Sequence, residues 1–200
     1  MTRFLYFMDI KFIPKRILNI MISPVKTWAV IHSENKSARD TAYKIVFPLS
    51  VLVAVAAAIG SFIFTHSQLS VVYSVFVGVK YLILITTVVY LSAIIFNTIT
   101  HTLDLGRDYS ISFRIIAYSL IPLLLCLIVS LVFESLFFIN ILAFYGLFIF
   151  WAGAERMLDP PAHKKVPMLI AASVTVIVLF ISINWILTRV FDRIYFAFLA

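Results

Sequence analysis

The chain has 200 residues, of which 63% are hydrophobic and 12% charged, and its mean hydropathy is +1.08. Soluble domains are closer to half apolar and a quarter charged, so this composition excludes an ordinary soluble domain. Several apolar runs approach or exceed the ~18–20 residues that cross the hydrocarbon core of a bilayer. These runs lack the alternation of a β-barrel strand, which predicts an all-α, polytopic membrane helical bundle. The net charge of +7 lies mostly before the first run, where anionic lipid headgroups, and not nucleic acid, are the expected partner.

Residues 1–44 are predicted to form a basic, interfacial segment on the cytoplasmic side. Its first half mixes aromatic and aliphatic residues with lysine and arginine, a pattern typical of a segment that lies in the plane of the interface. A disordered tail is the alternative. Ser23 and Pro24 form a helix-start signal and predict a short helix over residues 24–33. Trp28 in this helix is expected to anchor it at the level of the headgroups.

Five transmembrane helices are predicted over residues 45–187, followed by a short non-cytoplasmic tail at 188–200. In the first span, Ala54 and Ala58 lie four residues apart, a spacing of small side chains that lets a neighbouring helix approach closely. The expected spans are residues 45–64, 77–97, 115–133, 136–154 and 167–187.

Lysine and arginine are distributed unequally between the two ends of the predicted bundle. Of the sixteen, thirteen fall before the first span or in the second and fourth connections, two fall in the C-terminal tail, and Lys80 lies within a span. Positively charged flanks stay on the cytoplasmic side of a membrane. The N-terminus is therefore predicted to be cytoplasmic and the C-terminus non-cytoplasmic.

Two ionisable residues, Lys80 and Glu134, lie within or beside the predicted spans and are candidates for function on that ground. Both fall toward the non-cytoplasmic ends of their helices. They are interpreted as an intramembrane pair or as two side chains that reach separately to the interface. An ion path is the less favoured alternative, because a transporter places such groups nearer the midplane.

The sequence contains no recognisable catalytic or ligand-binding motif. The four histidines are dispersed, the single cysteine is Cys126, and no set of His, Cys, Asp and Glu has the spacing of metal ligands. There is also no glycine-rich phosphate loop. We therefore predict no catalytic, cofactor-binding or metal-binding residues, no cofactor, and a protein that is not an enzyme.

The middle span carries polar or small residues at every fourth position. The stripe predicts the face that packs against protein, and it comprises Tyr118, Pro122, Cys126, Ser130 and Glu134. The leucines across from it are expected to face lipid; they are Leu120, Leu124, Leu127 and Leu131. Pro122 removes a backbone donor and predicts a kink. The kink is interpreted as a static feature that shapes the bundle, with a hinge or a lined cavity as the alternative.

A set of short motifs along the chain resembles the Yip family of membrane proteins, and specifically its bacterial branch. The first motif has the form S-P-x-x-x-W-x-x-I-x-x-E, the second is A-Y-S-L-I-P at the start of the third span, and the third is a glycine-containing exit from the fourth span. The resemblance covers the chain from about Ile17 to Leu187. The residues that carry it are Ser23, Pro24, Trp28, Ile31, Glu34, Tyr118, Ser119, Pro122 and Gly153.

The resemblance implies a non-enzymatic integral membrane protein that acts as a scaffold, membrane organiser or adaptor. It implies protein partners or a homo-oligomer within the lipid bilayer, in a bacterial cytoplasmic (inner) membrane, or in early secretory membranes if the chain is eukaryotic. Eukaryotic members are associated with Rab GTPases through a long N-terminal domain with an acidic motif, and this chain departs from that pattern. A small oligomeric transporter or channel is the alternative function.

Overall fold

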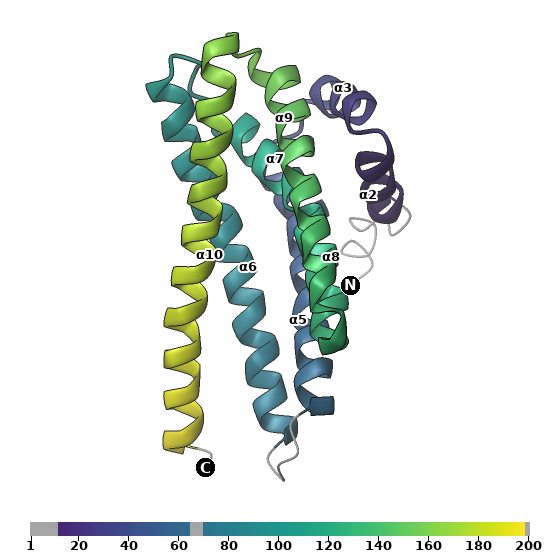
Figure 1. The fold of residues 1–200 in the computed structure, drawn as a ribbon, viewed down its shortest axis with the longest axis vertical. Helices are drawn as coiled ribbons and strands as arrows, with labels where there is room; N and C mark the ends of the chain where they lie inside the picture. The colour runs from purple at the N-terminus through teal and green to yellow at the C-terminus, as the bar shows by residue number, and fades with distance from the viewer. Residues whose placement is uncertain (1–11, 65–69, 199–200) are drawn as a thin grey trace, which may run out of the picture.

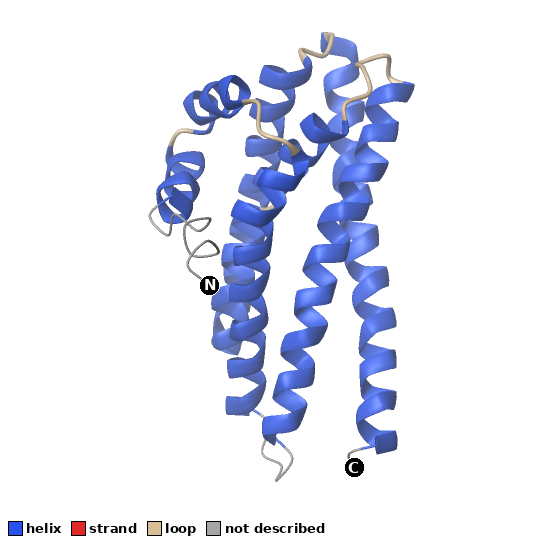
Figure 2. Cartoon of the chain, turned by 180° about the vertical axis from the view of Figure 1, so that it is seen from behind, coloured by secondary structure: helices blue, strands red, loops and turns tan. Residues whose placement is uncertain are grey.

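The computed structural model describes residues 12–64 and 70–198, and in this part of the chain all regular structure is helical (Figure 1; Figure 2). The predicted interfacial residues 1–11 lie outside it. Five helical stretches are long and apolar enough to cross a membrane, which confirms the all-α, five-span fold class. They are Ala38–Phe64, Val71–Thr102, Tyr109–Val132, Glu134–Leu158 and Ala162–Ala197, each longer than the span expected at its place.

Four helices form a row in which each packs on the next. Helix α10 (Ala162–Phe198) packs on α6 (Ser70–Thr102), α6 on α5 (Phe47–Phe64), and α5 on α8 (Ile121–Val132) (Figure 1). With 33 and 37 residues, α6 and α10 are about 50 and 55 Å long. The hydrocarbon core is only ~30 Å thick, so both helices reach well past the predicted spans, and α10 includes most of the predicted tail.

Small residues set the distances between these helices. A Cβ atom built on Gly78 of α6 would lie 3.0 Å from the Ala54 carbonyl oxygen and 3.1 Å from Ala58 Cβ, both on α5. This confirms the close approach predicted from the spacing of the two alanines. On the other side of α5, a Cβ on Gly60 would overlap the carbonyl oxygen of Leu131 in α8. The backbone of α8 therefore rests directly on α5.

The middle span, Tyr109–Val132, is divided into two helices by a break at Leu120. Helix α7 (Tyr109–Ser119) ends at Leu120, and α8 begins at Ile121 with Pro122 in its first turn. Proline is accepted in a first turn because its missing N–H has no intrahelical partner there. The span is therefore interrupted beside Pro122, where the sequence predicted a kink.

The burial of the middle span agrees only in part with the predicted stripe. Tyr118, Pro122 and Cys126 are buried, but Ser130 is half-buried and Glu134 is exposed. The leucines opposite do not all face lipid: Leu120 and Leu124 are 9% and 3% exposed, and Leu127 and Leu131 are half-buried. The reason is that α7 and α8 are covered on more than one side, by α5, α6 and α9.

The fourth span starts as a 3-10 helix. Segment η2 (Glu134–Phe144) has 3-10 geometry, departs from helical angles at Leu136, and buries none of its residues. It packs on α8 and continues as α9 (Tyr145–Leu158). The Asn140 side chain donates a 2.8 Å hydrogen bond to the Phe137 carbonyl, and such local side-chain bonds compete with the regular ladder of an α-helix. The sequence predicted a plain α-helix here.

The N-terminal segment forms a helical hairpin beside the end of the bundle that lies opposite the C-terminus (Figure 1; Figure 2). Helix α2 (Phe12–Ile22) and helix α3 (Pro24–Glu34) are separated by Ser23. Their main neighbour in the bundle is α9, which packs against α3. A short α4 (Ala38–Thr41) and a single π-helical turn, η1 (Ala42–Val46), lead from the hairpin into α5.

The contact between α5 and α8 predicts that Gly60→Ala destabilises the protein. Alanine has the higher helix propensity by about 1 kcal/mol, yet its Cβ must push α8 away, at a cost of about 1–3 kcal/mol. The measurement is the thermal unfolding midpoint in detergent. Gly78→Ala is the matched control, because its Cβ meets α5 at tight contact without overlap and should cost less. A Gly60→Ala midpoint equal to or above that of the unaltered protein would contradict the described packing.

Candidate functional site: the docked N-terminal hairpin

Trp28 joins the N-terminal hairpin to the membrane bundle. Its side chain is fully buried, and its indole N–H donates a 2.9 Å hydrogen bond to the Ile149 carbonyl of α9. The ring also meets Tyr118 of α7 edge-on, with 5.6 Å between the ring centroids. Trp28 was expected at the level of the headgroups, but it lies inside the protein. Burial of a large aromatic side chain that has a partner for its N–H is a strong anchoring contact.

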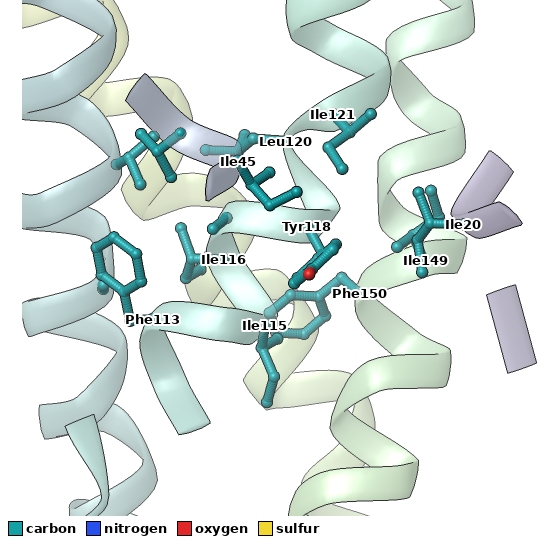
Figure 3. Packing of buried hydrophobic residues seen from close by; sticks show 14 of the residues in the cluster. Ile20, Ile45, Phe113, Ile115, Ile116, Tyr118, Leu120, Ile121, Ile149 and Phe150 are labelled. Carbon is teal, nitrogen blue, oxygen red and sulfur yellow. The ribbon is translucent and has the colours of Figure 1, made fainter. Parts of the chain in front are cut away.

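Gly153 provides the space for this ring. A Cβ at this position would come within 2.5 Å of two ring carbons of Trp28. The glycine at the exit of the fourth span and the tryptophan of the first motif are therefore two halves of one contact. Figure 3 shows the surroundings, with Tyr118 between Phe113 on the side of α6 and Ile149 of α9.

The turn between α2 and α3 is tied by Thr27 rather than by Ser23. The Thr27 hydroxyl lies 2.9 and 2.8 Å from the carbonyl oxygens of Asn19 and Ser23 and shares its one hydrogen between them. Ser23 precedes α3, and Pro24 lies in its first turn, but the Ser23 side chain makes no capping bond. The hydroxyl of Tyr145 in α9 donates a 2.9 Å hydrogen bond to the Met21 carbonyl. Both helices of the hairpin are thereby attached to the bundle or to each other.

Arg114 binds the C-terminal end of α3. Its guanidinium donates to the Ile31 carbonyl at 3.4 Å, to the Asn35 side-chain oxygen at 3.2 Å, and to the Ser110 carbonyl at 3.2 Å, while the residue is only 2% exposed. The last carbonyls of a helix lack intrahelical partners, and a cation is favourable beside them. Sequence reasoning counted Arg114 only as a flanking charge. Its position directly before an apolar run was the available signal.

Glu34 closes the hairpin through two ion pairs. Its carboxylate contacts Arg16 of α2, and its second oxygen lies 2.9 Å from Lys36 Nζ. Burial by itself would raise the pKa of this carboxyl, but hydrogen bonds and charge from Lys36 and Arg16 outweigh burial and hold the pKa below its ordinary value. Glu34 is thus charged in the docked state and ties the far ends of α2 and α3 together.

The remaining predicted site residues lie deeper in the bundle. Ser119 donates a 2.6 Å hydrogen bond to the Ile115 carbonyl. A Cβ on Gly146 of α9 would overlap the Ser119 carbonyl and lie 4.0 Å from Pro122 Cδ. The A-Y-S-L-I-P motif therefore serves the contact between the third span and α9.

Lys80 and Glu134 are not brought together. Among the described residues, the ion pairs do not include either of them. Lys80 Nζ lies 3.3 Å from the Thr188 hydroxyl of α10, whereas exposed Glu134 begins η2 beside α8. The helices α6 and α8 lie on different sides of α5. Within residues 12–64 and 70–198, no group of three His, Cys, Asp or Glu could hold a metal ion.

The Trp28 contact predicts a large effect of truncation at this one tryptophan. Trp28→Ala removes a fully buried aromatic and should lower the free energy of unfolding by about 3–5 kcal/mol. Trp28→Phe keeps the packing but loses the hydrogen bond to Ile149, at about 1 kcal/mol. Trp185 of α10 is 60% exposed, and Trp185→Ala is the matched control with a small expected effect. Thermal unfolding in detergent ranks the three variants. Equal losses at Trp28 and Trp185 would contradict a specific docking contact.

The Glu34 ion pairs predict a dependence of stability on pH. Because the folded-state pKa lies below the ordinary value of 4.5, the ionised carboxylate stabilises the protein above that value, and the contribution is lost as the pH falls through the folded-state pKa. Glu34→Gln should cost about 1 kcal/mol or less at neutral pH. The unfolding midpoints of the variant and the unaltered protein should converge as the pH falls below 4.5 and through the lowered folded-state pKa of Glu34. A constant difference across this range would show that Glu34 acts through packing and not through charge.

The Yip1 domain family matches residues 18–187 of the chain. No curated protein and no solved structure matches it. The matched range begins in α2, ends in α10, and contains Trp28, Arg114, Tyr118 and Gly153. Because the match covers well over half of the chain, this membrane protein belongs to the Yip1 domain family.

Proposed function

We propose that the chain is a non-enzymatic integral membrane protein of the Yip type that acts as a membrane scaffold, organiser or adaptor. The observation that carries this proposal is the docked hairpin. Side chains from three parts of the chain hold α2 and α3 against the bundle: the buried Trp28 and Arg114, and the half-buried Tyr145. A rigidly held segment outside the spans is what a scaffold offers to a partner or to a membrane surface.

The outer face of the hairpin supports contact with anionic lipid headgroups. It exposes large apolar residues together with the exposed ammonium groups of Lys15 and Lys26, and the apolar residues are Leu18, Ile22, Val25 and Val30. Mixed apolar and basic surfaces bind at the boundary between headgroups and acyl chains. By the distribution of lysine and arginine, this face lies on the cytoplasmic side, and we assign the protein to a bacterial inner membrane, in the bacterial branch of its family.

A small oligomeric transporter or channel remains the second candidate, favoured by one cavity. The cavity has a volume of about 280 Å³ and lies between the third span, the fourth span and α10, beside Pro122's neighbour Leu123. Its lining is apolar except for three side chains, Ser119, Asn140 and Ser173. An ion path needs charged or polar groups along its length. The apolar lining therefore supports the scaffold over the channel.

The two candidates predict different results in reconstituted vesicles. We expect vesicles that contain the purified chain to release ions and small fluorescent solutes no faster than protein-free vesicles. We also expect a photo-crosslinking residue placed at exposed position 26 to capture one defined neighbour in native membranes. Trp28→Ala should abolish this capture by undocking the hairpin, whereas Trp185→Ala should leave it unchanged. The scaffold proposal would be overturned in favour of the channel by two results together. Vesicles would release solute only when they contain the protein, and crosslinking at position 26 would be unchanged by Trp28→Ala.

A further inference from the structure

A second surface on the hairpin's end of the bundle has the features of a lipid site. A groove of about 550 Å³ lies between α4, η1 and the start of α5 on one side and α6 on the other, with the first residue of α7 at its edge. Its volume falls in the range of ligand pockets, ~300–1,000 Å³. Its lining includes Arg39, Tyr43, Phe47, Thr86, Tyr90 and Tyr109.

The end of the groove nearest the hairpin carries a guanidinium with no carboxylate partner. Arg39 is exposed, and its Cζ atom lies 5.7 Å from the centre of the Tyr43 ring. In the part of the chain that the structure describes, Arg39 forms no ion pair. The acidic residues of the adjoining helix starts are engaged locally: Asp40 accepts a 2.8 Å hydrogen bond from Ser37, and Asp108 caps α7 at 2.7 and 3.1 Å.

The opposite wall is held in place by edge-on and tilted contacts between aromatic rings. Tyr90 of α6 and Tyr109 of α7 both contact the fully buried ring of Phe113, with centroid distances of 5.1 and 5.8 Å. The two tyrosines therefore keep fixed positions while remaining at the groove. Tyrosine and arginine are the side chains that gather at the level of headgroups, where one end is apolar and the other polar.

The groove becomes apolar toward the membrane interior. At the junction of η1 and α5 the lining continues to Val46 and the half-exposed ring of Phe47. Along antiparallel α6 it continues to Thr86, one turn beyond Tyr90. The π-helical turn η1 lies at this point, and such turns are frequent at functional sites. A polar, cationic end and an apolar end between two spanning helices match the shape of an amphiphile.

We propose that this groove binds one anionic phospholipid, with its phosphate at Arg39 and the tyrosines and an acyl chain along Val46 and Phe47. A soluble anion would use only the Arg39 end. The inference rests on the proposed function, because it assumes that the end of the bundle that carries the hairpin lies at a membrane surface with anionic lipid. It adds a defined site to the general contact of the hairpin face.

The test is thermal unfolding of the full chain in a neutral detergent, with phosphatidylglycerol or phosphatidylcholine added to the micelles. We expect phosphatidylglycerol to raise the midpoint more than phosphatidylcholine does. Arg39→Gln should weaken the apparent affinity for phosphatidylglycerol roughly tenfold, as expected for the loss of a charge-assisted hydrogen bond. Arg156→Gln removes the same charge from an exposed position of α9 that does not line the groove, and should keep the affinity. Thr86→Trp fills the apolar end and should remove the protection, and its lipid-free midpoint reports whether it is folded.

Several outcomes would overturn the site. Equal protection by the two lipids, or equal losses in Arg39→Gln and Arg156→Gln, would mean diffuse charge attraction and no defined groove. Protection by glycerol phosphate alone would indicate a small-anion site, and full protection of folded Thr86→Trp would exclude the acyl chain. Stabilisation that follows protein concentration and not lipid would place a second copy in the groove. None of these measurements involves crosslinking or solute release, so the scaffold proposal can fail while the lipid site stands.

Discussion

The docking of α3 on α7 and α9 is the contact on which the described arrangement depends. It places the Trp28 ring directly against the backbone of α9 at residue 153. This contact is possible only because residue 153 is glycine, since a Cβ atom there would overlap the ring. The Ile149 carbonyl accepts the indole N–H in addition to its place in the helix, since a carbonyl oxygen has two lone pairs. In this position the C-terminal end of α3 contacts Arg114. The elements that follow, α4 and η1, then pack on α7 before the chain enters α5.

Several polar side chains form hydrogen bonds around the same contact. The guanidinium of Arg114 reaches two backbone carbonyls and one side-chain amide, and neutral acceptors of this kind keep a charged donor from being buried without partners. The hydroxyl of Tyr145 and the side chain of Thr27 likewise donate to backbone carbonyls of the hairpin. Hydrogen bonds therefore fix the geometry of the junction, while aromatic packing supplies most of its stabilisation.

The number of spans and their helical character could be predicted from the sequence. Both depend on the length and apolar composition of single segments, which are local properties. The approach of α6 to Ala54 and Ala58 was also predictable, because a small-residue spacing is visible in one segment. The division of the third span at Leu120 was not, since Pro122 is compatible with a kink or with a helix start. The roles of Trp28 and Arg114 depend on residues more than eighty positions away. No sequence pattern within one segment predicts contacts between such distant residues. The contact of Lys80 with Thr188 could not be predicted for the same reason.

The 3-10 geometry of η2 changes how far the fourth span can reach. A 3-10 helix rises about 2.0 Å per residue and an α-helix 1.5 Å, so residues 137–144, which follow the break at Leu136, extend about 4 Å further than they would as an α-helix. The turn after α8 can thus lie closer to the far membrane surface without additional residues. Conversion of this part of η2 to an α-helix would draw that turn inward by a similar distance. The length of the fourth span therefore depends on its helix type. A change in bilayer thickness would favour the 3-10 or the α-helical form of this segment.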